Sequence, residues 1–220
     1  MIGFLTTQIN YIMEYMHDDC DTIRIGDTLP EMTLTAYDPI KDKTVKIKMA
    51  DYIEKGKKKG KWQIYVFYPA DFTFICPTEL EEMANLYPEF QKEGAEVLSV
   101  SCDTAFVHKA WHDNSPAIKK VKYPMVADPT GILAKLFGVY IHEGDDAGLA
   151  LRGTFIVDPE GMLKTIEIHD NSVGRSARET LRKLRAAKFV RDNGGIQVCP
   201  AAWEPGSDTL KPGMNLVGKI

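Results

Sequence analysis

Two nearly continuous apolar runs, separated by one amphipathic segment, constrain the fold of this chain more than any other feature. The runs are WQIYVFY (62–68) and AEVLSVS (95–101), and such runs are typical of strands buried on both faces of a sheet. Between them, PTELEEMANLYPEFQKEG (77–94) places apolar residues at helical spacing. Pro77 suits the first turn of that helix, and the acidic residues after it favour the positive end of the helix dipole.

Further strands and helices are predicted along the rest of the chain. Alternating patterns predict strands at 32–37 and 43–49, a short strand at 124–128 and a hairpin at 153–168. Helical patterns predict helices at 104–114, 131–138 and 175–193, the last with its basic residues on a solvated face. Elements in this order predict an α/β domain of three layers, with a mixed sheet and flanking helices.

Composition divides the chain into three parts. Residues 1–23 are expected to form an N-terminal extension, because they lack the basic n-region and cleavage site of a signal peptide. Residues 24–193 form the α/β domain, and residues 194–220 are a tail that is rich in Pro and Gly and lacks helical periodicity. Trp203 and Cys199 in this tail predict that it docks on another part of the protein.

Charge and cysteine usage argue against several classes of function. The net charge of -4 argues against a nucleic-acid partner, and no run approaches the about 18 apolar residues of a membrane span. The four cysteines are too few for a disulfide scaffold. They include no CxxC pair, which argues against a zinc ribbon or a thioredoxin-type dithiol. A reducing cytoplasmic location is therefore expected.

Cys76 lies in TFICPTE (73–79), directly before the helix that follows the first buried strand. The thiolate is the nucleophilic form of cysteine, and a helix N-terminus or a nearby arginine favours that form. In an open α/β sheet, ligand sites gather at the strand ends where helices begin. A small buried side chain is the alternative, because most lone cysteines only fill space. Spacing alone leaves these two interpretations about equally open.

Three other residues favour the reactive interpretation. Thr73 can turn its hydroxyl toward the sulfur or a bound oxygen, and Pro69 restricts the loop and shields the thiolate. Arg152 directly precedes the strand GTFIVD, where it would stabilise a thiolate and hydrogen-bond an oxygen leaving group. An ordinary surface charge is the alternative interpretation of Arg152.

Four separated motifs, in the right order, resemble those of the peroxiredoxin family. PADFTFICPTE matches its Pro-x-x-x-Thr-x-x-Cys signature, and LRGTFIVDPEG is similar to the segment that carries its active-site arginine. VCPAAWEPG resembles the resolving-cysteine segment of typical two-cysteine members, and NLVGKI resembles the tail of the alkyl hydroperoxide reductase subfamily. The resemblance covers residues 24 to 220 and implies a thioredoxin-like fold with the peroxiredoxin insertions.

The resemblance also implies roles for matching residues. Six of them correspond to positions that act in the reaction: Cys76, Cys199, Thr73, Arg152, Pro69 and Glu79. The first two would be the peroxidatic and resolving cysteines, and the next two would bind and polarise the peroxide. The proline would shield the sulfur, and the glutamate would orient the arginine network.

The implied activity is thiol-dependent reduction of hydrogen peroxide and organic hydroperoxides. A sulfenic acid at Cys76 would condense with Cys199 of the other subunit, and an external dithiol would then reduce the disulfide. Thioredoxin and a flavoprotein disulfide reductase are both candidates for this reductant. The implied assembly is a homodimer, commonly five dimers in a ring. No cofactor is expected, because the sequence has no nucleotide fingerprint or haem attachment motif.

Three rival functions remain. A one-cysteine peroxiredoxin would leave Cys199 incidental and use an outside thiol, although VCPAAWEPG argues against this. A redox-regulated holdase chaperone would use Cys76 only to sense oxidation. A general disulfide oxidoreductase is disfavoured by the missing CxxC.

Other titratable residues receive structural interpretations. His108 and His112 are one helical turn apart and could hold a metal, but Trp111 beside them favours ordinary packing. Cys20 and Cys102 fit no motif and are expected to be structural.

Two departures from the family pattern predict resistance to over-oxidation. Members that are inactivated by over-oxidation carry a Gly-Gly-Leu-Gly loop and a Tyr-Phe pair in the tail. Here the comparable loop is EGDDAGLALRG and the tail contains no Tyr-Phe pair. We therefore expect the helix next to Cys76 to unfold readily.

Overall fold

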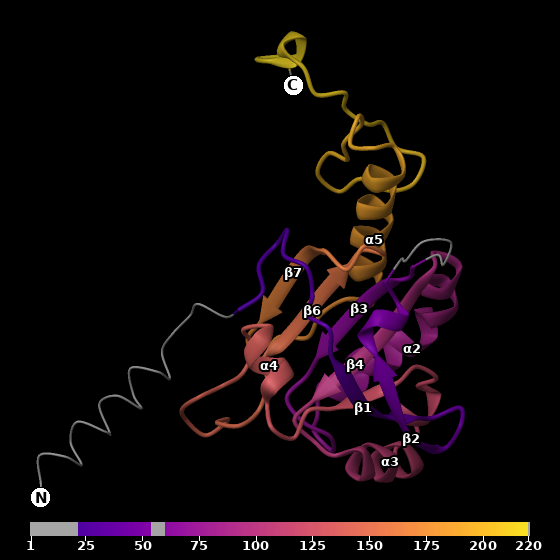
Figure 1. Cartoon of the computed structure of the whole chain (residues 1–220), viewed down its shortest axis with the longest axis vertical. Helices are drawn as coiled ribbons and strands as arrows, with labels where there is room; N and C mark the ends of the chain where they lie inside the picture. Colours follow the sequence, from indigo (N-terminus) through magenta and orange to yellow (C-terminus); the bar gives the residue numbers. More distant parts are fainter. Residues whose placement is uncertain (1–21, 54–59, 220) are drawn as a thin grey trace, which may run out of the picture.

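One mixed sheet of seven strands lies at the centre of the computed structural model, which describes residues 22–53 and 60–219 (Figure 1). The strands are β1 (Thr33–Asp38), β2 (Lys43–Lys48), β3 (Trp62–Phe67), β4 (Ala95–Ser101), β5 (Met125–Ala127), β6 (Arg152–Val157) and β7 (Leu163–His169). Their order across the sheet is β2-β1-β5-β4-β3-β6-β7. The sequence analysis predicted all seven strands and the mixed sheet.

The two apolar runs form the middle of this sheet. β3 and β4 pair in parallel, and every residue of β3 is buried. β6 pairs with β3 in the antiparallel direction, with Val66 opposite Thr154. Because the two strands run in opposite directions, β6 begins at the edge of the sheet where β3 ends.

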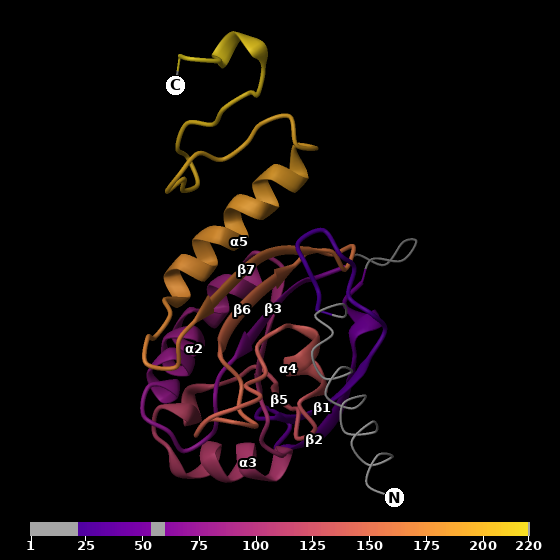
Figure 2. The same cartoon turned by 90° about the vertical axis from the view of Figure 1, so that its left-hand side faces the viewer.

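Within the described residues, four α-helices cover the two faces of the sheet (Figure 2). They are α2 (Cys76–Lys92), α3 (Ala105–Asn114), α4 (Ile132–Leu136) and α5 (Ala177–Asp192). Short 3₁₀ turns are η2 (Met49–Asp51), η3 (Ile118–Lys120) and η4 (Met214–Leu216). Helices α2, α3 and α5 pack with Ile64 and Val66 on one face, and α4 packs with Tyr65 and Phe67 on the other. None of the described helices is long and apolar enough to cross a membrane.

Two predicted helices are shorter than the sequence pattern suggested. The helix expected at 131–138 is confined to α4 because Gly131 and Gly138 have φ angles of 65° and 66°, outside the right-handed helical region. The helix expected from 175 begins at Ala177, because Ser176 caps it by accepting a hydrogen bond from the Glu179 N–H. Arg175 therefore lies in the loop before α5.

The C-terminal tail docks on α5, which agrees with the prediction from Trp203 that the tail packs on another part of the protein. The buried Trp203 ring lies 5.0 Å from the Phe189 ring, and its Nε1 donates to the carbonyl of Ser207 at 3.2 Å. Val198 and Leu210 form an isolated antiparallel bridge within the tail. Figures 1 and 2 show the tail beyond the far end of α5, away from the sheet.

Candidate active site

Cys76 is the first residue of α2, one residue earlier than the predicted start of that helix. Its side chain is fully buried. Ile75 is the N-cap residue and offers no side-chain acceptor, and a proline follows in the first turn. The backbone N–H of a first helical residue has no carbonyl partner within its helix. The N–H of Cys76 is therefore suited to hold an electronegative atom beside the sulfur.

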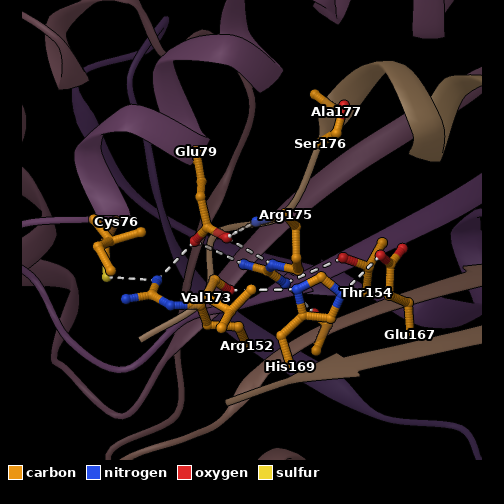
Figure 3. Close-up of polar contacts among 12 residues, drawn as sticks. Cys76, Glu79, Arg152, Thr154, Glu167, His169, Val173, Arg175, Ser176 and Ala177 are labelled. Atoms are coloured by element: carbon orange, nitrogen blue, oxygen red, sulfur yellow. Dashed lines mark hydrogen bonds and ion pairs between the residues drawn. The ribbon is translucent and has the colours of Figure 1, made fainter. Parts of the chain in front are cut away.

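Arg152 lies against Cys76 and is not the surface charge that was its alternative interpretation. It begins β6, and its Nη1 lies 3.3 Å from the Cys76 sulfur (Figure 3). Its Nε donates to the carbonyl of Asn171 at 2.9 Å, which fixes the plane of the guanidinium group. Only 3% of Arg152 is exposed, so solvent screens its charge little.

Glu79, one helical turn after Cys76, joins two arginines. Its Oε2 accepts from Nη1 of Arg152 at 2.7 Å, and its Oε1 accepts from Nε of Arg175 at 2.9 Å (Figure 3). Burial opposes ionisation of Glu79, but the hydrogen bonds and charges of the two arginines outweigh it and lower the pKa of this carboxyl. Charge-assisted bonds of this kind hold side chains in one geometry before a substrate arrives.

Arg175 is the member of this network that sequence reasoning missed. Beyond Glu79, its Nη1 donates to the Gly153 carbonyl at 2.7 Å and to Oγ1 of Thr154 at 3.1 Å. The sequence analysis grouped it with the solvated basic residues of the last helix, but only 8% of it is exposed. Its position in a loop was the missing signal, because it lies just before the capping residue Ser176.

Loop 69–75, which joins β3 to α2, contains the other two residues singled out near Cys76. Pro69 is buried. Thr73 donates its hydroxyl to the carbonyl of Ala70 at 2.8 Å. In the described state this proton is directed to the loop backbone rather than to the sulfur, and the alternative partner, a bound oxygen, stays a prediction. The lone pairs of the Thr73 oxygen remain able to accept a proton from a bound molecule.

Cys199 lies far from Cys76 within one chain. Its half-buried sulfur is 3.8 Å from the carbonyl of Ala186, and burial raises the pKa of its thiol. Arg175, beside Glu79, lies near the start of α5. From Ala177 to Ala186, α5 rises about 14 Å at 1.5 Å per residue. The structure therefore brings together Cys76, Glu79 and Arg152 but leaves Cys199 at a distance.

The two histidines of α3 are buried and contact groups of the protein. His108 lies between the Asp71 carboxylate and the Val126 carbonyl, and His112 contacts the Val121 carbonyl through Nε2 at 3.3 Å. Within the part of the chain that the structure describes, no group of three or more potential ligands is arranged to hold a metal ion.

Cys102 takes no part in the cluster around Cys76. Burial and the carboxylates of Asp128 and Asp103 raise the pKa of Cys102 to about 11, so its thiol is protonated at neutral pH. Cys20 lies outside the described residues.

Comparison with known proteins identifies the family of this chain. Residues 25–166 match the AhpC/TSA family. The chain is 54% identical over 162 residues to an alkyl hydroperoxide reductase C of Pseudomonas aeruginosa, which covers 74% of this chain and 84% of that protein. It is 50% identical over 197 residues to one of Staphylococcus aureus, which covers 89% and 98%.

Solved structures agree with this assignment. Enterococcus faecalis AhpC superposes with a TM-score of 0.72 at 44% identity, over 80% of this chain and 98% of that one. The reduced two-cysteine peroxiredoxin of Plasmodium vivax gives a TM-score of 0.78 at 27% identity, over 88% and 95%. The chain therefore belongs to the AhpC/TSA family and is an enzyme of the peroxiredoxin class.

Proposed function

We propose that this chain is a thiol peroxidase that reduces hydrogen peroxide and organic hydroperoxides through Cys76. The observation that carries the proposal is the 3.3 Å contact between Nη1 of Arg152 and the sulfur at the N-terminus of α2. An arginine and a helix N-terminus both favour the thiolate, which is the reactive form. The names of the relatives, alkyl hydroperoxide reductase C, support the same substrate class.

In the proposed first step, the Cys76 thiolate attacks one oxygen of the peroxide in line with the O–O bond. An S–O bond forms, the O–O bond breaks, and the second oxygen leaves with the electron pair and takes up a proton to become water or an alcohol. Arg152 and the Cys76 N–H would stabilise the negative charge that develops on the oxygens. Glu79 and Arg175 would keep the Arg152 guanidinium in place.

Thr73 receives a revised role in this proposal. Because it donates its proton to the Ala70 carbonyl, its oxygen would act as an acceptor for the O–H of the peroxide. This interaction would orient the peroxide, and the buried Pro69 would shield the thiolate from water.

In the proposed second step, the sulfenic acid on Cys76 condenses with a Cys199 thiol and releases water. The separation of the two sulfurs along α5 supports a Cys199 that comes from the partner subunit. Burial of Cys76 further requires that the first turn of α2 unwinds and that the tail leaves α5. A conformational step of this kind can limit the overall rate.

The proposed cycle ends outside the chain. Peroxiredoxins act with a reductant and oligomerise, and we infer that an external dithiol, either thioredoxin or a flavoprotein disulfide reductase, reduces the disulfide. A homodimer, assembled further into a ring of five dimers, and a cytoplasmic location complete the proposal. The division into an extension (1–23), a peroxidase domain (24–193) and a tail (194–220) belongs to it as well.

The experiment that tests this function treats the reduced protein with one equivalent of hydrogen peroxide. Intact mass and non-reducing gels are recorded for the wild type, Cys76→Ser and Cys199→Ser, with Cys102→Ser as the matched control. We expect a disulfide-linked dimer in the wild type and in Cys102→Ser, and none in the other two variants. A wild type whose Cys76 takes up no oxygen would contradict the proposed function.

The same experiment separates the one-cysteine enzyme, and an aggregation assay separates the holdase. A wild-type monomer that carries only added oxygen on Cys76 would indicate a one-cysteine enzyme. A holdase would be indicated if Cys76→Ser suppressed aggregation of an unfolded protein as well as the wild type does.

A further inference from the structure

We propose that Asp71 and His108 are positioning residues, which hold loop 69–75 in the conformation that presents Thr73 and Cys76 to the peroxide. This inference rests on the proposed function and adds to it a second support, separate from the arginine network. Neither residue touches the sulfur or Arg152, so both would act through the loop.

Asp71 is a buried carboxyl in the middle of the loop. Its Oδ1 accepts from the Tyr68 hydroxyl at 2.7 Å, and its Oδ2 lies 2.8 Å from Nδ1 of His108. The side chains of Asp71 and His108 are both fully buried. The Asp71 N–H donates to Oδ2 of Asp103 at 2.9 Å, and the Ser101 hydroxyl donates to the same oxygen at 2.7 Å. Side chain and backbone of this one residue thus bind Tyr68 just after β3, Asp103 just after β4 and His108 of α3.

The contacts of His108 place a hydrogen on its Nε2 and a shared proton between its Nδ1 and Asp71. Its Nε2 lies 3.1 Å from the Val126 carbonyl, which can only accept, so Nε2 carries a hydrogen. The short contact between Nδ1 and Asp71 then requires one further proton, either on the ring or on the carboxyl. In both cases the pair is neutral overall, which suits a site without solvent. An asparagine at position 71 would supply the same hydrogen from its amide.

Loop 69–75 depends on these contacts because its own backbone is strained. Phe72 has a φ angle of 56°, in the left-handed region that a phenylalanine rarely adopts. Such a conformation persists only where the surroundings hold it. The ring of Phe72 packs against Trp111 of α3 at 6.1 Å, and the Asp71 carboxyl is the neighbouring anchor. Thr73 follows directly, so a shift of this anchor moves the Thr73 oxygen.

His112 provides a matched control on the same helix. It is also buried, it also contacts a backbone carbonyl through Nε2, and it follows His108 by one turn. The contacts of its ring are with Val121, Tyr37 and the Asp113 carboxylate, and loop 69–75 contributes to none of them. Loss of its imidazole should therefore affect stability without moving Thr73.

The experiment measures the second-order rate constant for oxidation of Cys76 by hydrogen peroxide, in single turnovers quenched with an alkylating reagent. Asp71→Ala and His108→Ala should lower this constant by about 10- to 100-fold, because a displaced catalytic group costs rate in this range. His112→Ala should react at the wild-type rate. Asp71→Asn, which preserves the hydrogen bonds, should recover most of the rate. Urea unfolding midpoints of all variants separate loss of stability from loss of positioning.

Three results would overturn the inference. They are a wild-type rate in folded Asp71→Ala, a loss in His112→Ala equal to that in His108→Ala, and a loss in Asp71→Asn equal to that in Asp71→Ala. If the alanine variants fail to fold, Tyr68→Phe removes one hydrogen bond and keeps the ring, and an unchanged rate would then overturn the inference. Failure of the wild type to react would instead contradict the proposed function.

Discussion

The two cysteines of the proposed cycle lie in opposite surroundings. Cys76 is fully buried at a helix N-terminus, and its arginine neighbour is held by a glutamate that also binds Arg175. Cys199 is half-buried on a tail, and its sulfur makes one weak contact with the Ala186 carbonyl. One site is arranged before the substrate arrives, and the other is held by contacts that can be released. We therefore expect the surroundings of Cys76 to set the rate of attack on the peroxide, and the tail that carries Cys199 to supply the movement that brings the two sulfurs together.

Glu79→Gln should have the largest effect, because it removes the carboxylate that holds Arg152 and Arg175 beside Cys76. The amide leaves the buried charges of Arg152 and Arg175 without a counter-charge. We expect a loss of about 3–5 kcal/mol in the free energy of unfolding, the usual cost of removing one partner of a buried ion pair. Urea unfolding measures this loss.

The control for that variant is Glu93→Gln. Glu93 pairs with Arg185 and Lys188, all three partly exposed, so its loss should cost about 1 kcal/mol or less. Equal losses of unfolding free energy in the two variants would mean that the buried ion pairs of Glu79 stabilise the protein no more than the partly exposed pairs of Glu93.

Arg152→Met should have the next largest effect, on rate rather than stability. Methionine keeps a long apolar side chain and removes the charge next to the sulfur. The rate constant for oxidation of Cys76 by hydrogen peroxide should fall by about 10²–10³-fold, as for the loss of one preorganised donor. Arg185→Met, which removes a partly exposed arginine paired with Glu93 at the end of α2, should react normally. A fast Arg152→Met variant would remove the arginine from the mechanism.

Sequence reasoning succeeded where the signal was local. The buried character of β3, the helix that begins beside Cys76 and the strand that begins at Arg152 each follow from a run of fewer than about 20 residues, within the length of ordinary elements. The place of Arg152 next to Cys76 did not follow from such runs, which left a surface charge open, and only the family resemblance pointed to it.

Sequence reasoning failed where the partner lies far along the chain. Arg175 binds Glu79 across 96 positions, and His108 contacts Asp71 across 37, so neither pair leaves a pattern in a short window. Such contacts are set by tertiary structure, which periodicity does not encode.

The pH dependence of stability should show a smaller effect of the same network. The pKa of Glu79 is lowered in the folded state, so its contribution is fully present above its unfolded pKa of about 4.3 and is lost as pH falls through the lower folded value. As the pH falls from about 5 toward the folded pKa of Glu79, the free energy of unfolding should decrease by up to about 1.4 kcal/mol per pH unit because of this group. The difference between the pH dependences of unfolding free energy in the wild type and in Glu79→Gln measures the contribution of Glu79. Parallel curves for the two proteins would contradict it.

Trp203→Ala should give the smallest effect, and it tests the movable region alone. Loss of the ring that packs on Phe189 weakens the docking of the tail on α5, so disulfide formation after oxidation should become several-fold faster. The rate of Cys76 oxidation should not change, because the ring lies outside the arginine network. Quenched-flow mass spectrometry follows both steps, with Val217→Ala, at a tail position that is 70% exposed, as the control.

This variant also sharpens the expectation that the enzyme resists over-oxidation. A sulfenic acid that is trapped faster as a disulfide has less time to react with a second peroxide, so Trp203→Ala should accumulate even less sulfinic acid at Cys76 than the wild type. Sulfinic acid that builds up in the wild type at micromolar peroxide would contradict that resistance. A slower disulfide in Trp203→Ala would mean that the docked tail lies on the route to the partner sulfur. In that case, order in the tail would serve the reaction as order around Cys76 does.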